Sequence, residues 1–406
     1  MTDKDGHRKP LVALVVPDLS VYSGVPAVAL FLYRIIEASG RYVPELISLS
    51  SSVRDANSTH ISSPKSWFAA ARTTSEEWQG LNYVHVGAEL TEFEFQRYRP
   101  RRVLTELLDK FDIVQIVAGC PPWAQVTRDV KGKVALQVAT LSAVERASML
   151  QQVRGPRRIW LSLMTKINTA IEKHALNRAD VVFVENSWMC DLLQKKFGSE
   201  KIVFAPPGID TGKFVPGTYK PDGYLLSVGR FADPRKNLRL LFDAYHRFRK
   251  SKPDAPRLVL AGTLAPAKAD LDFATSLGLL PYVDIFENVS DEQLLSLYQN
   301  ASLFLLSSNE EGLGLVIGEA MAAGLPVVST RCGGPETFVV EGVTGYLTPV
   351  GDAEAMALKI ESLINNPALR KTMGLAARER VAQNFSIEVT GKVFLDHYDA
   401  LMAGSV

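Results

Sequence analysis

Cysteine is scarce in this sequence, which has 406 residues and only three cysteines, Cys120, Cys190 and Cys332. They are too few and too scattered for a disulfide framework or a thiolate metal site, which indicates a reducing compartment such as a bacterial cytoplasm. No apolar run approaches the roughly 18 residues of a membrane-spanning helix, and the polar N-terminus lacks the apolar part of a signal peptide. No expected strand is followed by G-x-G-x-x-G, which argues against a nicotinamide-dependent dehydrogenase.

Net charge is nearly absent as well. Lys and Arg number 45, against 44 Asp and Glu, which argues against a protein whose main partner is nucleic acid. The balance conceals an asymmetry, because residues 1–205 carry 26 basic and 21 acidic side chains, net +5, whereas residues 206–406 carry 19 and 23, net −4. We therefore expect the two halves to face different partners.

The composition, 47% hydrophobic and 22% charged, is typical of a soluble globular protein, and the length indicates two domains. Short apolar runs alternate with helix-length stretches in the first half, which predicts an α/β domain with a doubly wound parallel sheet. These runs lie at residues 11–16, 44–49, 83–86, 113–117, 134–138 and 181–184. For the Ser/Thr-rich residues 50–79 we expect irregular loops around one short helix.

A second alternating series, from residue 224 to residue 329, predicts another doubly wound domain. Residues 205–222 between the two series are dense in proline and glycine, so we interpret them as a linker. We expect an N-terminal domain over 1–205 and a second domain over 206–385. A cleft between two such domains is a usual place for a ligand.

One candidate site follows the first strand of the second domain, at the edge where open parallel sheets bind ligands. Gly229 lets the backbone approach a ligand there. Arg230 and Lys236 can bind one anion, Arg as a fork and Lys as a point charge, and a diphosphate is the natural candidate. The alternative is a solvated basic turn before a helix.

A glycine-rich segment with two acidic residues eight positions apart, Glu311 and Glu319, is more specific. Gly312 and Gly314 leave N–H groups uncovered at the start of an expected helix, which favours an anion. A carboxylate beside an anion is unfavourable unless it accepts hydrogen bonds from hydroxyls, and sugars carry many of them. Glu319 is therefore a candidate partner of a ribose diol. The alternative is that both glutamates only complement the helix dipole.

The run EGLGLVIGEAMAAGLPVVST resembles the E-x7-E signature of the retaining glycosyltransferases of family 4. Their fold is GT-B, an α/β fold in which two doubly wound Rossmann-like domains face a central cleft. Other segments agree with that family in order and spacing, namely SVGRF, RKN, CGGPETFVVEGVTGYLTP and PPGIDTGKFVP. The similarity is dense over residues 180–350 and covers the first 180 residues only in outline.

The resemblance implies a role for each matching position. Arg230 and Lys236 would bind the diphosphate of the donor and act as electrostatic catalysts. Glu319 would bind the ribose, and Glu311, also counted as catalytic, would contact the donor sugar. The other expected donor-binding positions are Gly24, Gly229, Asn288, Val289, Gly312, Leu313, Gly314 and Leu315. No metal ion or other cofactor is implied, and the sequence shows neither an Asp-x-Asp at a strand end nor a His/Cys cluster with ligand spacing.

The N-terminal half would supply the acceptor side. Relatives often carry histidine at two strand ends, where we expect Gln115 and the Leu141-Ser142 pair in this chain, so a histidine contact with the sugar is not expected. Relatives also return their last helix to the N-terminal domain, which we expect for residues 386–406. A hinge near residues 205 and 385 would then close on the donor.

Residues 153–173 combine five basic residues and one acid with interleaved apolar side chains. Such a helix either lies on an anionic membrane surface or packs on the core with its charges in water. A second basic cluster, with arginines at 97, 99, 101 and 102, either faces the acceptor or is solvated.

These features favour a retaining, metal-independent hexosyltransferase. It would move a sugar from a UDP- or GDP-sugar to a glycan, lipid-linked or small-molecule acceptor in bacterial polysaccharide or glycoconjugate biosynthesis. Its location would be cytoplasmic, with peripheral contact at the inner face of the membrane through residues 153–173. A GT-B nucleotide-sugar 2-epimerase is one alternative, which would need different acids and a histidine in the cleft. The other is a non-catalytic glycan-binding GT-B protein, which would have no need of Arg230, Lys236 and Glu319.

Overall fold

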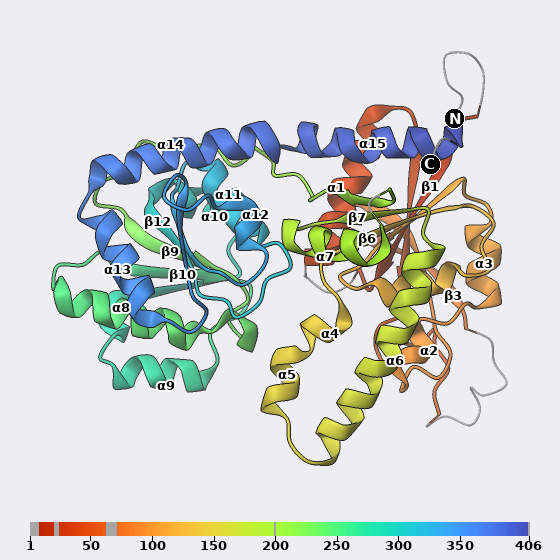
Figure 1. Ribbon diagram of the computed structural model, residues 1–406, viewed down its shortest axis with the longest axis horizontal. Helices are drawn as coiled ribbons and strands as arrows, with labels where there is room; N and C mark the ends of the chain where they lie inside the picture. The colour runs from red at the N-terminus through yellow and green to blue at the C-terminus, as the bar shows by residue number, and fades with distance from the viewer. Residues whose placement is uncertain (1–7, 20–23, 62–70, 199, 405–406) are drawn as a thin grey trace. The chain divides into compact units, whose positions relative to one another are not determined.

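The computed structural model describes residues 8–404, apart from 20–23, 62–70 and 199 (Figure 1). Contacts between Cα atoms divide the chain into two compact units. The first unit comprises residues 1–185, 189–207 and 391–406, and the second comprises 186–188 and 208–390. Both units are α/β, as the alternating apolar runs predict.

The chain leaves the first unit after residue 207 and returns to it at residue 391, a few residues later than the expected changes at 205 and 385. Two contacts explain the shift. The N–H of Ile209 donates to the carbonyl of Phe385 at 2.7 Å, and the N–H of Ile387 donates to the carbonyl of Ile209 at 3.2 Å. The start of the last helix is thereby tied to the second unit. The expected linker, 205–222, likewise belongs mostly to the second unit rather than lying free.

The first unit contains an eight-stranded sheet with the order β3-β4-β2-β1-β5-β6-β7-β8. Its strands are β1 (Leu11–Pro17), β2 (Val43–Leu49), β3 (Thr73–Trp78), β4 (Leu81–Val86), β5 (Ile113–Val117), β6 (Lys133–Val138), β7 (Val181–Val184) and β8 (Ile202–Phe204). Neighbouring strands are parallel except for the β3–β4 hairpin.

The expectation of only irregular loops and a short helix over residues 50–79 is wrong where the structure describes that segment, because β3 lies within it. Gln79 and Gly80 both have positive φ angles, +51° and +78°, which allows the tight turn that pairs β3 with β4. The described residues 50–61 and 71–79 contain no helix. The central part of the segment, 62–70, lies outside the described residues.

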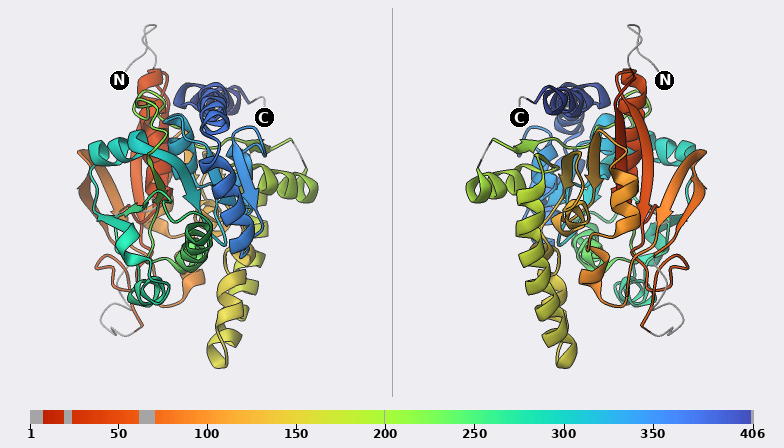
Figure 2. Two further views of the ribbon diagram at one scale, coloured as in Figure 1. Left: turned by 90° about the vertical axis from the view of Figure 1, so that its left-hand side faces the viewer. Right: turned by 90° about the vertical axis from the view of Figure 1, so that its right-hand side faces the viewer.

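Eight helices and a 3₁₀ turn accompany this sheet in the described residues. They are α1 (Gly24–Ser39), α2 (Glu94–Arg97), α3 (Arg102–Leu108), η2 (Pro121–Thr127), α4 (Ser142–Glu145), α5 (Ala147–Gln152), α6 (Pro156–Arg178), α7 (Ser187–Phe197) and α15 (Ile387–Ala403). The end of α6 that follows α5 extends away from the sheet of the first unit (Figures 1 and 2).

The last helix, α15, contributes to the core of the first unit from Gly391 onward. Its Phe394 ring lies 4.5 Å from the ring of Phe183 on β7, centroid to centroid. The hydroxyl of Tyr398 donates to Oε1 of Gln115 at 2.8 Å, and both side chains are fully buried. Gln115 therefore lies in the middle of β5 as an anchor for α15. It does not stand at a strand end in place of a histidine.

The second unit has a six-stranded parallel sheet with the order β11-β10-β9-β12-β13-β14. Its strands are β9 (Tyr224–Val228), β10 (Leu258–Gly262), β11 (Val283–Glu287), β12 (Ala301–Leu306), β13 (Val327–Thr330) and β14 (Gly345–Thr348). Its helices and 3₁₀ turns are η3 (Pro234–Lys236), α8 (Leu238–Ser251), α9 (Lys268–Ser276), η4 (Leu280–Tyr282), α10 (Asp291–Asn300), α11 (Leu315–Ala322), α12 (Pro335–Phe338), α13 (Ala353–Ile364) and α14 (Pro367–Asn384).

Alternate residues of these strands enter two separate apolar clusters. On β9, Leu225 packs with α8, α9 and α13, whereas Leu226 packs with α10, α11 and α14. The sheet is therefore covered by helices on both faces, which explains its nearly continuous apolar strands. No helix in the described part of the chain is both long enough and apolar enough to cross a membrane.

Candidate active site

The strand order of the second unit reverses between β9 and β12. The chain moves outward from β9 through β10 to β11, then returns to β12 on the other side of β9. The loops that follow β9 and β12 consequently leave the sheet in opposite directions and open a crevice at its carboxyl edge. Both sequence segments singled out above, 229–237 and 311–319, begin at this crevice.

The loop after β9 is fixed by its own side chains. The N–H of Gly229 donates to the carbonyl of Ala261 at 3.0 Å, which keeps the turn close to β10. Asp233 caps η3, since its carboxylate accepts from the N–H of Arg235 at 3.0 Å. Asn237, with φ +44°, ends η3 and caps α8. This geometry directs the side chain of Lys236 back over Gly229, to within 3.8 Å of where a Cβ would stand.

The ammonium of Lys236 lies 2.5 Å from Oε1 of Glu311, and both side chains are largely buried, at 16% and 11% exposure. Ser308 donates to the same carboxylate oxygen at 2.6 Å. The structure thus brings Gly229, Lys236 and Glu311 together at the crevice. A lysine positioned by a glutamate beside a helix N-terminus can bind an anionic group of a ligand.

Arg230 takes a different partner. Its Nη2 lies 3.7 Å from Oδ2 of Asp233, and the side chain is 40% exposed. Burial would raise the pKa of Asp233, but hydrogen bonds from Arg235 and the charges of Arg235 and Arg230 outweigh burial and lower it. Asp233 therefore stays ionised and holds both arginines near the crevice.

Gly314 allows the turn that starts α11. It has φ +79°, a left-handed conformation that favours glycine, and it is the N-cap residue of the helix. The first N–H groups of a helix have no acceptor within it, so those of α11 are available at the crevice. Leu313 is buried in the apolar cluster, and Leu315 packs against it. Of the expected donor-binding residues in this loop, these two offer only their backbone to a ligand.

Glu319 lies on α11 and is half-buried. Its Oε2 accepts a hydrogen bond of 2.8 Å from the hydroxyl of Tyr298 on α10. Burial raises the pKa of Glu319, although the Tyr298 hydrogen bond and the charge of Lys213 act in the opposite direction. A carboxylate has room for several donors, so it can also accept hydroxyls of a ligand.

The remaining expected positions lie farther apart. Asn288 follows β11, is exposed, has φ +50° and donates from its N–H to the carbonyl of Gly262 at 2.8 Å. Val289 packs against the apolar cluster, so only its backbone is open to a base. Gly24 is the first residue of α1 in the first unit and is exposed, and Ser23 before it lies outside the described residues.

Three residues that support the glycine-rich loop were missed in the sequence. Asn186, which follows β7 but groups with the second unit, donates from its side chain to the carbonyl of Gly312 at 2.6 Å. Ser308 and Tyr298 bind the two glutamates of the E-x7-E motif. Ser308 lies three residues before Glu311, and this short spacing could have identified it from the sequence. Asn186 carries no such signal, because its partner is 126 residues away.

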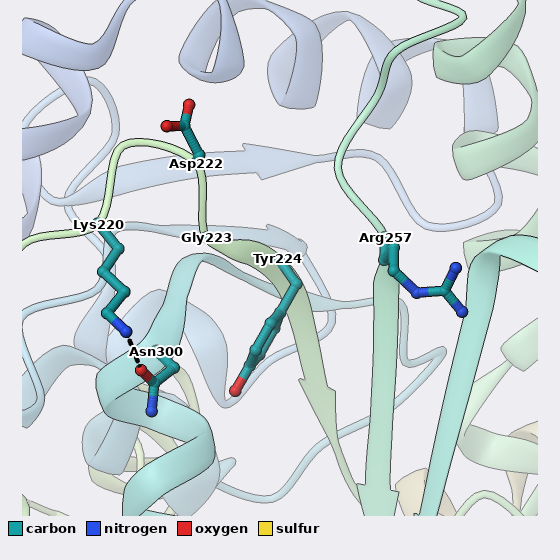
Figure 3. Close-up of a pocket in the computed structure, with 6 residues that line it drawn as sticks. All are labelled: Lys220, Asp222, Gly223, Tyr224, Arg257 and Asn300. Atoms are coloured by element: carbon teal, nitrogen blue, oxygen red, sulfur yellow. Dashed lines mark hydrogen bonds between the residues drawn. The ribbon is translucent and has the colours of Figure 1, made fainter.

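A shallow pocket lies at the amino edge of the same sheet, on the side away from the crevice (Figure 3). It is lined by Lys220, Asp222, Gly223, Tyr224, Arg257 and Asn300. None of the residues expected to bind a donor lies here. In the described part of the chain, no group of three or more His, Cys, Asp or Glu side chains is placed to hold a metal ion.

Comparisons with known proteins agree with the resemblance. Residues 209–380 match the model of the family described as glycosyl transferases group 1. A D-inositol 3-phosphate glycosyltransferase of Corynebacterium urealyticum is 31% identical over 251 residues, which cover 57% of this chain and 59% of that protein. A GDP-mannose-dependent alpha-(1-6)-phosphatidylinositol monomannoside mannosyltransferase of Mycolicibacterium smegmatis is 27% identical over 57% of this chain and 64% of its own length. The chain thus matches less than two thirds of either relative.

Among solved structures, Anabaena HepE in complex with UDP-glucose superposes with a TM-score of 0.69. The match is 14% identical in sequence and covers 96% of this chain and all of that one. At 14% identity this similarity shows the fold alone. The fold is the expected GT-B class with two Rossmann-like units. The second unit of this chain, which holds the Lys236–Glu311 pair at the crevice, is thus similar to the glycosyl transferases of group 1 over residues 209–380.

Proposed function

We propose that this chain transfers a sugar from a nucleotide diphosphate sugar to an acceptor, with retention of the anomeric configuration and without a metal ion. The observation that carries this proposal is the buried pair of Lys236 and Glu311 beside the N-terminus of α11. A fixed ammonium and free helix N–H groups at one crevice suit a diphosphate leaving group. The match of residues 209–380 to the model of the group 1 glycosyl transferases supports the assignment.

The leaving nucleotide gains negative charge as the bond to the sugar breaks. Lys236 and Arg230 would stabilise that charge, since cations that are already oriented need no reorganisation during the reaction. Glu311 would hold Lys236 and contact the sugar, and Glu319 would accept the ribose hydroxyls. We assign no general base, because in a same-face transfer a phosphate oxygen of the donor can take the acceptor proton.

The substitution Lys236→Ala tests this assignment. We expect turnover to fall by about 10²–10³-fold, as for the removal of one oriented donor at a developing anion, with weaker binding of nucleoside diphosphates. Thermal stabilisation by a panel of UDP- and GDP-sugars identifies the donor first. Product analysis by NMR then reads the anomeric configuration, and an assay in EDTA tests the independence from metal. Unchanged turnover in Lys236→Ala contradicts the proposal.

An epimerase or a purely glycan-binding protein gives different results in the same experiments. An epimerase would convert the nucleotide sugar without an acceptor, and a binding protein would leave it unchanged. We favour neither alternative. The two segments that form the crevice, 229–237 and 307–319, contain no histidine, whereas they carry Arg230, Lys236 and Glu319.

We further propose that the acceptor is lipid-linked and that the start of α6 contacts an anionic membrane. Three apolar residues of its first two turns are exposed rather than packed, Ile159 at 73%, Leu163 at 49% and Trp160 at 48%, whereas Leu161 between them is half-buried. Arg157 and Arg158 on the same turns are exposed as well. Only the later part of the helix, from Met164, packs on the first unit. Exposed apolar side chains beside arginines are typical of a helix that lies in a membrane interface.

Sedimentation with vesicles that contain phosphatidylglycerol tests this contact. Replacing Ile159 and Trp160 by serine, or Arg157 and Arg158 by glutamine, should move the protein from the pellet to the supernatant. A matched control replaces Arg99 and Arg102, which are exposed arginines outside α6. Equal sedimentation of all variants would assign α6 a structural role.

A further inference from the structure

Three consecutive residues, Asn186, Ser187 and Trp188, reach the candidate active site from a distant part of the sequence. They follow β7 and group with the second unit, whereas residues 1–185 and 189–207 belong to the first. We call them the 186–188 segment. Its contacts lie on two loops of the second unit, the glycine-rich loop after β12 and the loop after β13.

Asn186 holds the glycine-rich loop from its buried side. The side chain of Asn186 is 0% exposed, and its Nδ2 donates to the carbonyl of Gly312 at 2.6 Å. In a trans peptide the carbonyl and the N–H of the next residue point in opposite directions. The bond therefore turns the N–H of Leu313 away from Asn186 and from the interior in which Asn186 lies.

The N–H of Leu313 belongs to a row of unused donors. In the described part of the chain, none of the N–H groups of residues 312–316 donates to another residue. Successive N–H groups near a residue with positive φ, here Gly314, form a concave site for an anion. Rotation of the Gly312–Leu313 peptide would bring a carbonyl into that site instead of an N–H. Gly312 has no side chain to resist this rotation, so the orientation depends on Asn186.

Ser187 and Trp188 attach the same segment to the loop after β13. The N–H of Ser187 donates to Oγ1 of Thr337 at 3.2 Å. The indole of Trp188 covers the backbone of Gly333, where a Cβ would lie 2.7 Å from Nε1 and 3.3 Å from Cε2. Asn186 therefore holds Gly312 from a backbone that is itself fixed to the second unit.

The two loops are also joined to each other at Glu311. The N–H of Glu311 donates to the carbonyl of Cys332 at 3.2 Å, and its carbonyl accepts from the N–H of Gly334 at 3.0 Å. The backbone of Glu311 is thus fixed by the second loop. The next carbonyl, that of Gly312, accepts only from Asn186 among the residues that the structure describes.

We infer that Asn186 is a positioning residue for the diphosphate, which orients the N–H of Leu313 as a donor to the anion. It acts through the Gly312–Leu313 peptide and does not touch the ligand. An amide suits this task, because it donates to the carbonyl without adding a charge beside Lys236 and Glu311. The identity of the ligand rests on the function proposed above, whereas the hold of Asn186 on the loop does not.

Isothermal titration with UDP, GDP and pyrophosphate tests the inference. Asn186→Leu removes the donor at similar volume, and we expect the Kd of the nucleotide that binds to rise about tenfold, as for the loss of one hydrogen bond to a charged group. Pyrophosphate has neither ribose nor base, so its Kd should rise by a similar factor. Asn168→Leu is the matched control, since Asn168 is also 0% exposed but lies in the first unit. It should bind like wild-type protein, and equal affinity in Asn186→Leu would overturn the inference.

Asn186→Asp separates the hydrogen bond from a loss of packing. An ionised aspartate cannot donate to the carbonyl of Gly312, whereas a protonated one can. We expect the Kd of Asn186→Asp, relative to wild-type protein, to fall as the pH is lowered from about 8 to about 5.5, while the same ratio stays constant in Asn186→Leu. Comparison with wild-type protein at each pH cancels the titration of Glu319. A constant ratio in Asn186→Asp as well would overturn the inference and leave Asn186 a structural role.

Hydrogen exchange without ligand tests the hold on the loop by itself. The peptide that covers residues 311–319 should exchange faster in Asn186→Leu than in wild-type protein, and at the wild-type rate in Asn168→Leu. If neither a nucleotide nor pyrophosphate binds to wild-type protein, the proposed function fails, and faster exchange in Asn186→Leu would still support the hold of Asn186 on the loop. Unchanged exchange in Asn186→Leu would overturn it.

Discussion

Lys236 and Glu311 form a buried ion pair, 2.5 Å between Nζ and Oε1, although 75 residues separate them in the sequence. Each residue follows a different strand, β9 or β12, and these strands are neighbours at the reversal of the sheet order. The pair therefore depends on the topology of the whole sheet. It also places a charge on each side of the crevice.

A double-mutant cycle measures how much each member depends on the other. Lys236→Met leaves Glu311 buried without its cation, and Glu311→Gln leaves Lys236 without its anion, so each single change should destabilise the second unit. The double variant should lose less unfolding free energy than the two single variants lose together. We expect a coupling energy of about 1–3 kcal/mol. Urea unfolding of the four proteins gives this value. Additive effects would show that the two charges are independent.

Removal of the Tyr298 hydroxyl should make nucleotide binding more sensitive to pH. That hydroxyl stabilises the ionised form of Glu319, whose pKa burial already raises. In Tyr298→Phe the pKa rises further, so the carboxylate that we propose accepts the ribose hydroxyls is lost at a higher pH than in wild-type protein. We expect the Kd for UDP or GDP to rise several-fold at pH 6 and much less at pH 8. Titrations of Tyr224→Phe supply the control, since that hydroxyl donates only to the carbonyl of Leu297.

Glu185 predicts a pH-dependent stability of the first unit. Burial raises the pKa of Glu185 to about 7, well above the value of about 4.3 for an unfolded chain. The folded protein therefore binds the proton more tightly, and this contribution to stability is complete below about pH 4 and lost as the pH rises through 7. Glu185→Gln needs no proton, so it should be more stable than wild-type protein by about 3–4 kcal/mol at pH 8.

Thermal unfolding at several pH values follows this difference, which should shrink toward zero near pH 4. The exposed Glu77→Gln is the control and should match wild-type protein throughout. A constant advantage of Glu185→Gln at every pH would mean that titration of Glu185 is not its cause.

Two constraints favour glycine at position 333, namely its left-handed backbone conformation and the close approach of a neighbouring side chain. It has φ +106°, and a Cβ there would lie 2.7 Å from Nε1 of Trp188. Gly351 has a similar φ of +85° but nothing within 4 Å of a Cβ. Gly333→Ala should therefore destabilise the second unit more than Gly351→Ala, by about 1–3 kcal/mol for the added overpacking. Urea unfolding of the two variants compares them, and equal losses would show that backbone strain alone matters.

Much of the fold was predictable because most of the strands are continuous apolar runs. The exceptions are edge strands. The sequence of β3, TTSEEW, is exposed along almost its whole length, so no burial pattern marks it as a strand. The returning helix was expected only from the resemblance, because the bond from Tyr398 to Gln115 spans 283 residues and leaves no local trace.

The candidate site was predictable in its residue types but not in its pairing. Arg230 and Lys236 are close in sequence, and both were expected on one anion. In the structure each of them faces its own carboxylate, because Asp233 folds back on Arg230 and Glu311 arrives from another loop. Such pairings depend on which strands become neighbours. The roles of these residues in donor binding stay predictions until the variants are measured.

The division of the first unit into separated segments sets an order of completion during synthesis. Phe394 and Tyr398, which fill its core, emerge only after the 183 residues from 208 to 390 of the second unit. At about 5–20 residues per second, that interval lasts roughly 10–40 s. During this interval the second unit can fold, but Phe183 and Gln115 of the first unit have not yet met their partners on α15. The unit that is translated first is therefore finished last, and its exposed sheet is where a chaperone would be needed.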